Sequence, residues 1–445
     1  MSTANKIFTN TLWQVVIRIV NILVGVFSLA MITRILGQAG FGFYTTAMAF
    51  VQIFMIVVDL GLYLTLLREI STVKEQQAEN KIVNNIFTIR VISSLLVIVL
   101  IPIIINFFPY SAAVKSGVVY FMWAFFFQSL ISTLTAVFSK KLAMPKVALV
   151  DLFNKLLYAG FLVYLFFRPG GNLNEVLLSA SVAHFIAFIL FYFFLRKYVR
   201  LWLAWDFKYW KQIFHRTWPL AVTVVLNLLY FKADTLVLSA YYSPEDVGLY
   251  GAPYRVLEAV ASFPHMFMSL ILPLFTAAWV SKNMDKLKDT LQNSFDFFSI
   301  IVIGMIAGTW LISEPLMILL AGQEFAGSGA ILNVLILATA MIFFGTLFTY
   351  LVVALQAQKQ MIKYFLITAV IGIIGYFIFI PRFSYWGAAY MTLFVETMIV
   401  IFAYWVVRKN TKLGLNFKVF YKCLLAGLIA LVLGGYMKEI NIILA

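Results

Sequence analysis

Polar side chains recur at helical spacing inside the long apolar stretches of this chain. The first stretch carries them every three or four residues, at Asn10, Gln14, Arg18, Asn21, Gly25 and Ser28. This spacing places them on one face of a helix. The guanidinium group of Arg18 suits a diphosphate, because it donates paired hydrogen bonds and stays charged in a low dielectric. The stripe therefore predicts a polar surface that binds an anionic group of a substrate.

Three further apolar stretches carry stripes of the same kind. Their members are Thr45, Gln52 and Asp59 in one stretch, Thr223, Asn227, Tyr230 and Asp234 in another, and Arg255, Glu258, Ser262, His265 and Ser269 in the third. Charged side chains inside apolar spans usually face a cavity or a partner. We therefore expect a substrate-binding set made of Arg18, Asn21, Arg90, Asn227 and Arg255. A second set, Asp59, Asp234 and Glu258, is expected to couple an ion or to serve the structure.

Several of these charges also have a purely structural interpretation. Arg255 and Glu258 lie three residues apart on one helix and can neutralise each other. Asp151 and Lys155 lie four residues apart, and they fit a structural ion pair better than a binding site.

The remaining candidates have structural alternatives of their own. Asp234 can cap an unwound turn, and the long side chain of Arg90 can extend to the cytoplasmic end of its helix. Arg18 can pair with an acid on another helix, and Asp59 is the first such acid to consider. His265 fits a hydrogen-bonded packing residue better than a proton carrier. These alternatives stay open at the level of the sequence.

The constellations that mark catalytic sites do not occur in this sequence. It contains no Walker loop, no group of His, Cys and Asp at metal-ligand spacing, and no Gly-x-Ser-x-Gly elbow. Its single cysteine, Cys423, excludes an intrachain disulfide. We therefore expect a protein that is not an enzyme, that binds no cofactor and no metal, and that does not hydrolyse ATP.

The composition fits a membrane protein. The chain has 445 residues, of which 63% are hydrophobic and only 11% charged, and its mean hydropathy is +0.97. A soluble domain has about 25% charged residues. Too little polar surface is available to coat a globule of this size, so a soluble enzyme, a disordered chain and a secreted disulfide scaffold are all excluded.

Thirteen apolar runs are long enough to cross a bilayer, which takes about 20 residues. They are residues 11–33, 43–67, 82–106, 117–139, 147–167, 176–195, 217–242, 248–280, 294–313, 329–355, 364–380, 386–407 and 417–437. A backbone in lipid must satisfy its own hydrogen bonds, so each run is predicted to be a helix. The sequence predicts an all-α integral membrane protein.

The basic residues predict the orientation of these spans. The net charge is +15, and most of the lysines and arginines lie at the N-terminus and in the loops after even-numbered spans. Loops rich in Lys and Arg stay in the cytoplasm. We therefore expect a multi-pass protein of the cell or inner membrane with a cytoplasmic N-terminus, whose positive charge meets membrane lipid and no nucleic acid.

The chain also contains an internal repeat. At an offset of 206 positions, the residues that match or correspond in type are Asn21 with Asn227, Ser28 with Asp234, Gly42 with Gly248, Tyr44 with Tyr250, and Gln52 with Glu258. Six spans separate the two copies, so both copies have the same orientation. The repeat predicts two parallel six-helix lobes, residues 1–200 and 217–408, joined by a cytoplasmic interfacial linker at 201–216. An additional C-terminal helix lies within residues 409–445.

Two segments of this repeat resemble a known family. The stretch TRILGQAGFGFYTTA (Thr33–Ala47) and the stretch KADTLVLSAYYSPEDVGLYGAPYRVLE (Lys232–Glu258) are similar to signatures of the polysaccharide transporter branch of the multidrug/oligosaccharidyl-lipid/polysaccharide (MOP) exporter superfamily. Pro253 stands where that pattern usually has alanine. The thirteenth span exceeds the family's twelve-helix core.

The resemblance implies a V-shaped, two-lobed flippase of the kind found in this superfamily and in its multidrug (MATE) branch. Such a flippase moves polyprenyl-diphosphate-linked oligosaccharides, the repeat units of polysaccharides, by alternating access. Its partners would be membrane lipid, the lipid-linked glycan and enzymes of glycan assembly. Energy would come from an ion gradient or the membrane potential.

Two other functions are weighed against this one. A drug or cation antiporter of the MATE type would have a cavity led by carboxylates, and the arginines of the polar stripes argue against it. A membrane polysaccharide polymerase or glycosyltransferase would carry a large outer loop with Arg, Asp or His, whereas all the predicted outer loops are short.

Overall fold

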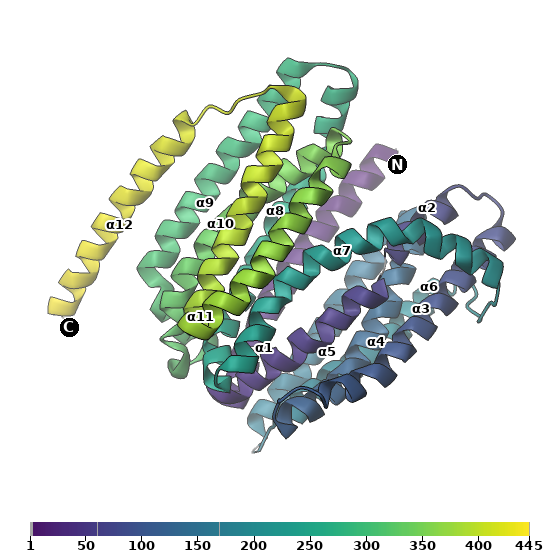
Figure 1. Cartoon of the computed structure of the whole chain (residues 1–445), viewed down its shortest axis with the longest axis horizontal. Coiled ribbons are helices and arrows are strands. Elements are labelled where there is room, and N and C mark those ends of the chain that lie inside the picture. Colours follow the sequence, from purple (N-terminus) through teal and green to yellow (C-terminus); the bar gives the residue numbers. More distant parts are fainter. Residues whose placement is uncertain (1–2, 60, 169, 445) are drawn as a thin grey trace. The chain divides into compact units, whose positions relative to one another are not determined.

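We describe the protein from a computed structural model, in which every regular element is a helix (Figure 1). It describes the backbone of residues 3–59, 61–168 and 170–444, and the side chains of residues 17, 20–54, 61–168, 170–215 and 232–436. The elements are α1 (Thr3–Asp59), α2 (Leu62–Ser71), α3 (Gln76–Ile105), α4 (Ala112–Lys140), α5 (Met144–Phe167), α6 (Leu173–Leu195), α7 (Phe207–Tyr241), α8 (Pro244–Val280), α9 (Met284–Ala321), a 3-10 helix η1 (Gln323–Phe325), α10 (Ser328–Ala354), α11 (Gln358–Thr411) and α12 (Lys418–Leu444).

The prediction of an all-α membrane protein is confirmed. In the described part of the chain, ten helices are long and apolar enough to cross a membrane, and no strand occurs. To within one residue at their ends, the predicted spans lie on single helices, except the second, residues 43–67, which runs from α1 into α2. Short polar residues begin several of them: the side chains of Ser111, Asn172, Asp206 and Asn283 accept backbone N–H groups in the first turns of α4, α6, α7 and α9.

Two of the helices contain a break that divides them into two predicted spans each. α1 has 57 residues and α11 has 54, which would make straight rods of about 80 Å, far longer than the roughly 30 Å hydrocarbon layer. α1 breaks at Gly37 (φ 65°, ψ −175°), into a first arm before and a second arm after this residue. α11 breaks at Ser384 (φ 52°, ψ −137°). Each break lies between the two spans that the sequence predicts.

The second predicted span, residues 43–67, is interrupted in the structure. α1 ends at Asp59, and α2 begins at Leu62 after Gly61, which has a left-handed backbone (φ 71°, ψ 20°). Glycine adopts this conformation without the steric penalty of a Cβ atom. The continuous apolar run concealed this interruption, because hydropathy carries no information about backbone angles.

The chain forms two compact units, Met1–Gly248 and Leu249–Ala445. In the first unit, α4 is the central helix and packs against α1, α2, α3 and α6, while α7 packs against α1, α2 and α3. Its core contains Leu134, Phe138 and Phe191. This division groups α7 with the first six spans, so the predicted lobe boundaries (1–200, 217–408) remain a prediction based on the repeat.

In the second unit, α10 is the most buried helix and lies between α9 and α11. Phe298, Phe343 and Leu347 are in its core. α12 lies along α9 (Figure 1), where Gly427 and Gly434 approach Ile303 and Leu311. Small residues let membrane helices come this close.

Hydrogen bonds from side chains of α3 hold the segment that precedes α7. The amide of Asn84 donates to the carbonyl of Arg200 (3.0 Å) and accepts from the N–H of Trp202 (2.7 Å). Thr88 accepts from Ala204 N–H at 2.9 Å. Side chains of α3 therefore satisfy alternate backbone groups of this connector, residues 200–206. α7 begins at Phe207, so the second half of the predicted linker, residues 207–216, is helical.

Candidate functional site

Three of the predicted site residues have side chains outside the described residues. They are Arg18 and Asp59 on α1 and Asn227 on α7. The other five, Asn21, Arg90, Asp234, Arg255 and Glu258, have described surroundings.

Asn21 belongs to a polar cluster formed by three helices of the first unit. Its amide Nδ2 donates to Asp151 Oδ2 on α5 at 2.7 Å, and Asn21 is only 6% exposed. Lys155 Nζ lies 3.8 Å from the same oxygen, so the predicted Asp151–Lys155 ion pair is present but is longer than the bond to Asn21. The side chains of Asp151 and Lys155 are 49% and 39% exposed, which leaves this side of the cluster open.

The buried side of the cluster is a histidine and an amide that the sequence did not single out together. Asn154 on α5 pairs with Nε2 of His184 on α6 at 3.2 Å. Nδ1 of His184 lies 2.8 Å from the carbonyl oxygen of Ala180. Because a carbonyl only accepts, Nδ1 carries the proton, and in the neutral ring Nε2 accepts from Asn154. Oδ1 of Asn154 is buried without a hydrogen-bond partner among the described residues.

Arg90 is fully buried between α3 and α4. Its Nε donates to the carbonyl of Ser129 at 3.0 Å, and its side chain has no exposed surface. The hydroxyls of Ser94 and Ser129 bond to each other alongside it at 2.8 Å. The alternative in which Arg90 extends to the cytoplasmic end of its helix is therefore wrong. The backbone carbonyl inside the protein takes the place of water at the helix end.

Arg255 and Glu258 form an ion pair on α8, with Arg255 Nη1 lying 2.9 Å from Glu258 Oε2. Their side chains are 25% and 27% exposed. The two side chains therefore neutralise each other, as the structural interpretation expects. Both are still partly exposed, so a ligand could reach them. Asp234 on α7 is fully buried, and its Oδ1 accepts the N–H of Thr235 at 2.6 Å.

A buried acid on α11 was not among the predicted residues. Glu396 lies in the twelfth predicted span and is 5% exposed. Within the described part of the chain its carboxyl group accepts no hydrogen bond and joins no ion pair. One sequence signal was available, a lone acid within the apolar run 386–407, with Thr392 four residues before it on the same helix.

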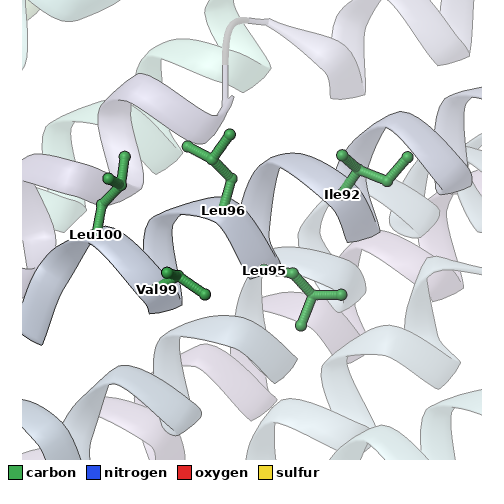
Figure 2. Close-up of a pocket in the computed structure, with 5 residues that line it drawn as sticks. All are labelled: Ile92, Leu95, Leu96, Val99 and Leu100. Carbon is green, nitrogen blue, oxygen red and sulfur yellow. The ribbon is translucent and has the colours of Figure 1, made fainter.

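The hollow drawn in Figure 2 has no polar lining. Its residues, Ile92, Leu95, Leu96, Val99 and Leu100, all belong to α3 and are aliphatic. A stripe of this kind on one helix suits contact with lipid chains and offers nothing that recognises a polar ligand. The described residues contain no group of three or more His, Cys, Asp or Glu side chains that could hold a metal ion.

The described polar groups offer hydrogen-bond donors, acceptors and charges inside the predicted spans. The polar clusters lie on α1, α5 and α6 in one unit, and on α8 and α11 in the other. The first contains amides, a carboxylate, an ammonium group and an imidazole, and the second contains carboxylates and the guanidinium group of Arg255; such groups inside a span are often functional.

Comparison with known proteins identifies the family. The family model described as "Polysaccharide biosynthesis protein" matches residues 7–279. The capsular polysaccharide biosynthesis protein CapF of Staphylococcus aureus is 25% identical over 250 residues, which make up 55% of this chain and 62% of CapF. The match thus spans less than two thirds of the length of CapF.

Solved structures share the fold. The lipid II flippase MurJ, in an inward closed conformation, superposes with a TM-score of 0.76 at 14% identity, over 94% of this chain and 91% of MurJ. An inward-facing multidrug resistance transporter of the MATE family in the MOP superfamily gives 0.68 at 11% identity, over 90% and 98% of the two chains. At these identities the matches establish the fold. Since the family match covers more than half of the sequence, this chain belongs to the polysaccharide biosynthesis protein family, and it shares its fold with these two membrane proteins.

Proposed function

We propose that this protein is a flippase that carries polyprenyl-diphosphate-linked oligosaccharide across the cytoplasmic membrane by alternating access. The observation that carries the proposal is the combination of a polysaccharide biosynthesis family with the fold of a lipid II flippase over nearly the whole chain. A transporter in a pathway of polysaccharide synthesis needs a glycan cargo. The hydrophobic carrier explains why a protein with so little polar surface handles it.

The diphosphate is the part of this cargo that a protein in lipid can recognise most strongly. Guanidinium groups at membrane depth supply charge and paired donors for it. We assign this role to Arg18, Asn21, Arg90, Asn227 and Arg255, as the sequence predicts. In the described conformation Asn21 donates to Asp151 and Arg90 donates to Ser129, so contact of either with substrate requires these bonds to exchange.

The coupling function is assigned to the acids Asp59, Asp234 and Glu258. Nothing in the sequence matches an ATP-binding loop, so an ion gradient or the membrane potential supplies the energy. Two parallel six-helix lobes that rock about the substrate site, 1–200 and 217–408, complete the proposed mechanism.

Arg18 gives the sharpest test of substrate recognition. Arg18→Ala is expected to abolish export in a complementation assay while the protein accumulates normally in the membrane. Arg18→Lys keeps the charge but loses the planar pair of donors, so it should retain partial export. Full export by Arg18→Ala would contradict the assignment.

A double variant separates recognition from structural pairing. If Arg18 only neutralises Asp59, then Arg18→Ala leaves a carboxylate unpaired in lipid and lowers the protein level on an immunoblot. Arg18→Ala combined with Asp59→Asn would then restore both level and export. Under the proposal, the double variant accumulates but does not export.

A drug or cation antiporter is the second candidate, because the MATE transporters share this fold. Vesicles containing the purified protein distinguish the two. The flippase moves a short-chain polyprenyl-diphosphate oligosaccharide between leaflets and does not extrude a cationic dye. Dye extrusion without glycan movement would favour the antiporter.

A further inference from the structure

The two copies of the repeated turn touch each other at their glycines. Gly42 lies near the start of the second arm of α1, and Gly248 lies near the start of α8. A Cβ atom on Gly42 would overlap the carbonyl oxygen of Pro244 and lie 3.1 Å from the backbone nitrogen of Gly248. A Cβ atom on Gly248 would overlap the carbonyl oxygen of Gln38 and lie 3.4 Å from the nitrogen of Gly42. The two backbones are therefore too close for a side chain at either position.

This contact is reciprocal in the numbering of the repeat. Gln38 and Pro244 are separated by the same 206 positions as Gly42 and Gly248. The glycine of each copy thus meets the residue four positions before the glycine of the other copy. A contact in which residue i meets j and the equivalent of j meets the equivalent of i indicates a two-fold axis between equivalent surfaces. Such an axis between the two turns is what a parallel internal repeat requires.

The equivalence extends to the tyrosines of the repeat. Tyr44 and Tyr250, each two residues after its glycine, are both buried, with exposed fractions of 7% and 0%. In both copies of the Gly-x-Tyr segment, the glycine therefore contacts the other copy and the tyrosine is buried. Chance similarity of apolar sequences does not produce this agreement of contacts.

The forces across the contact are weak and are easily exchanged. Glycine backbones that approach this closely gain dispersion and weak Cα–H···O interactions. A side-chain bond accompanies them, from Gln38 Nε2 to the carbonyl of Glu245 at 3.3 Å. A contact within one predicted lobe serves for comparison. Near the first turns of α4 and α6, the hydroxyl of Ser116 donates to Asn174 Oδ1 at 2.9 Å.

We propose that Gly42 and Gly248 form the seal by which the two repeats close the transport path at the predicted outer side, and that this contact parts when the cargo is released. The contact itself follows from the geometry. Its parting in a transport cycle rests on the proposed function, and the experiments below test the two statements separately.

Cross-linking tests the contact. In a Cys423→Ser background with a protease site inserted after Gly170, we would replace Gln38 and Glu245 by cysteine and apply a short, reducible bifunctional thiol reagent. The matched control replaces Ser116 and Asn174. Both pairs flank the protease site, so a cross-link keeps the two fragments together on a gel. Both pairs should cross-link with similar yield, and cross-linking of the control pair alone would overturn the proposed contact.

Transport measured on the same samples tests the parting of the contact. With the 38–245 pair linked, translocation of the lipid-linked oligosaccharide should fall by about tenfold or more and recover on reduction, because rocking of the lobes is blocked. The linked 116–174 pair should change the rate less than about twofold, since both residues move with one lobe. An unchanged rate in the linked 38–245 protein would overturn the seal.

A spectroscopic experiment tests the parting of the contact without using any substrate, so it applies even if the substrate is not a lipid-linked oligosaccharide. Spin labels at positions 38 and 245 should give a close population that broadens the spectrum and a separated population resolved by double electron–electron resonance. Labels at 116 and 174 should give one population. A single close population at 38 and 245 under all conditions would refute the parting, whichever substrate the protein carries.

Glycine variants provide the last test. Gly42→Ala should enlarge the separated population and lower the yield of the 38–245 cross-link, because the methyl group overlaps Pro244. Adding Gly248→Ala should give little further change, since both substitutions disrupt one contact. Gly160→Ala is the control, because nothing lies within 4 Å of a Cβ atom there. Equal cross-linking of the Gly42→Ala and Gly160→Ala proteins would contradict the proposal.

Discussion

At the scale of the residue, many of the described polar side chains in the spans form hydrogen bonds within their own helix. Hydroxyl groups in the spans bond to the carbonyl four residues earlier in the same helix, as Thr46 does with Gly42 and Thr339 with Leu335, both at 2.9 Å. Lipid offers no alternative partner, so local bonds of this kind make a polar residue tolerable in an apolar helix. A buried polar group without such a local bond is an exception to this pattern.

Glu396 is such an exception and gives the first prediction at this scale. Burying an uncompensated charge in an apolar span costs several kcal/mol. Glu396→Gln keeps the shape and adds no charge, so it should accumulate to the wild-type level and unfold at a similar temperature in detergent. Glu396→Lys should lower both.

The exposed acid Asp289 on α9 serves as the control for this pair of variants. Asp289→Lys should leave the membrane level unchanged, because its side chain is in solvent. A loss of protein for Glu396→Gln as large as for Glu396→Lys would show that the carboxylate form stabilises the fold.

At the scale of the element, the connector before α7 illustrates how helices of this protein are placed by side-chain bonds to backbone. The amide of Asn85 accepts both the N–H of Asp206 at 3.0 Å and the indole N–H of Trp210 at 2.9 Å. Together with Asn84 and Thr88 it holds an extended segment against α3. The position at which α7 begins is therefore set by three buried side chains on another helix.

Asn84→Ala is predicted to loosen this connector. The substitution leaves Trp202 N–H and the Arg200 carbonyl without their partner, which costs about 1–3 kcal/mol when such groups are buried. Thermal unfolding should begin at a lower temperature, and limited proteolysis should cut within residues 200–206 faster. Asn106→Ala is the matched control at the C-terminal end of α3, because among the described residues the Asn106 side chain donates only to the nearby Pro102 carbonyl.

The acid that caps α7 predicts a pH dependence. The N–H of Tyr209 and the ammonium group of Lys81, 3.1 Å away, hold the pKa of Asp206 below its usual range. A depressed pKa stabilises the fold at pH values above the unfolded value of about 3.9, and this contribution is lost as pH falls through the folded value.

Protease resistance of the connector should therefore stay constant between about pH 8 and pH 5 and fall below about pH 4. Asp206→Asn keeps a capping oxygen but cannot be charged, so its resistance should lack this acid transition. An identical acid transition in the wild type and in Asp206→Asn would assign it to another group.

At the scale of the whole molecule, the charge distribution predicts the orientation in the membrane. Cys423 lies on α12 close to Lys418 and Lys422, on the side predicted to be cytoplasmic. An impermeant thiol reagent should leave Cys423 unlabelled in intact cells and label it after lysis. Ser243→Cys in a Cys423→Ser background should label in intact cells, since Ser243 is exposed in the turn between α7 and α8. The reverse pattern would invert the topology.

The sequence by itself determined the class of the fold and the positions of its spans. A run of about 20 apolar residues can satisfy its backbone in lipid only as a helix, so hydropathy sufficed to place every span except the second on a single helix. The repeat was also visible in the sequence, because Gly42 and Gly248 are constrained by backbone contact and cannot be replaced by a residue with a side chain without moving the chain.

The tertiary structure alone decided how the helices break and which polar residues are partners. The pattern of apolar residues carries no information about a single backbone angle, so it did not predict the left-handed turn at Gly61, which interrupts the second predicted span. Asn21 meets Asp151 across 130 residues, and Asn154 meets His184 across 30. A stripe shows which face of a helix is polar. The helix opposite that face is fixed by packing, and packing is a property of the folded chain.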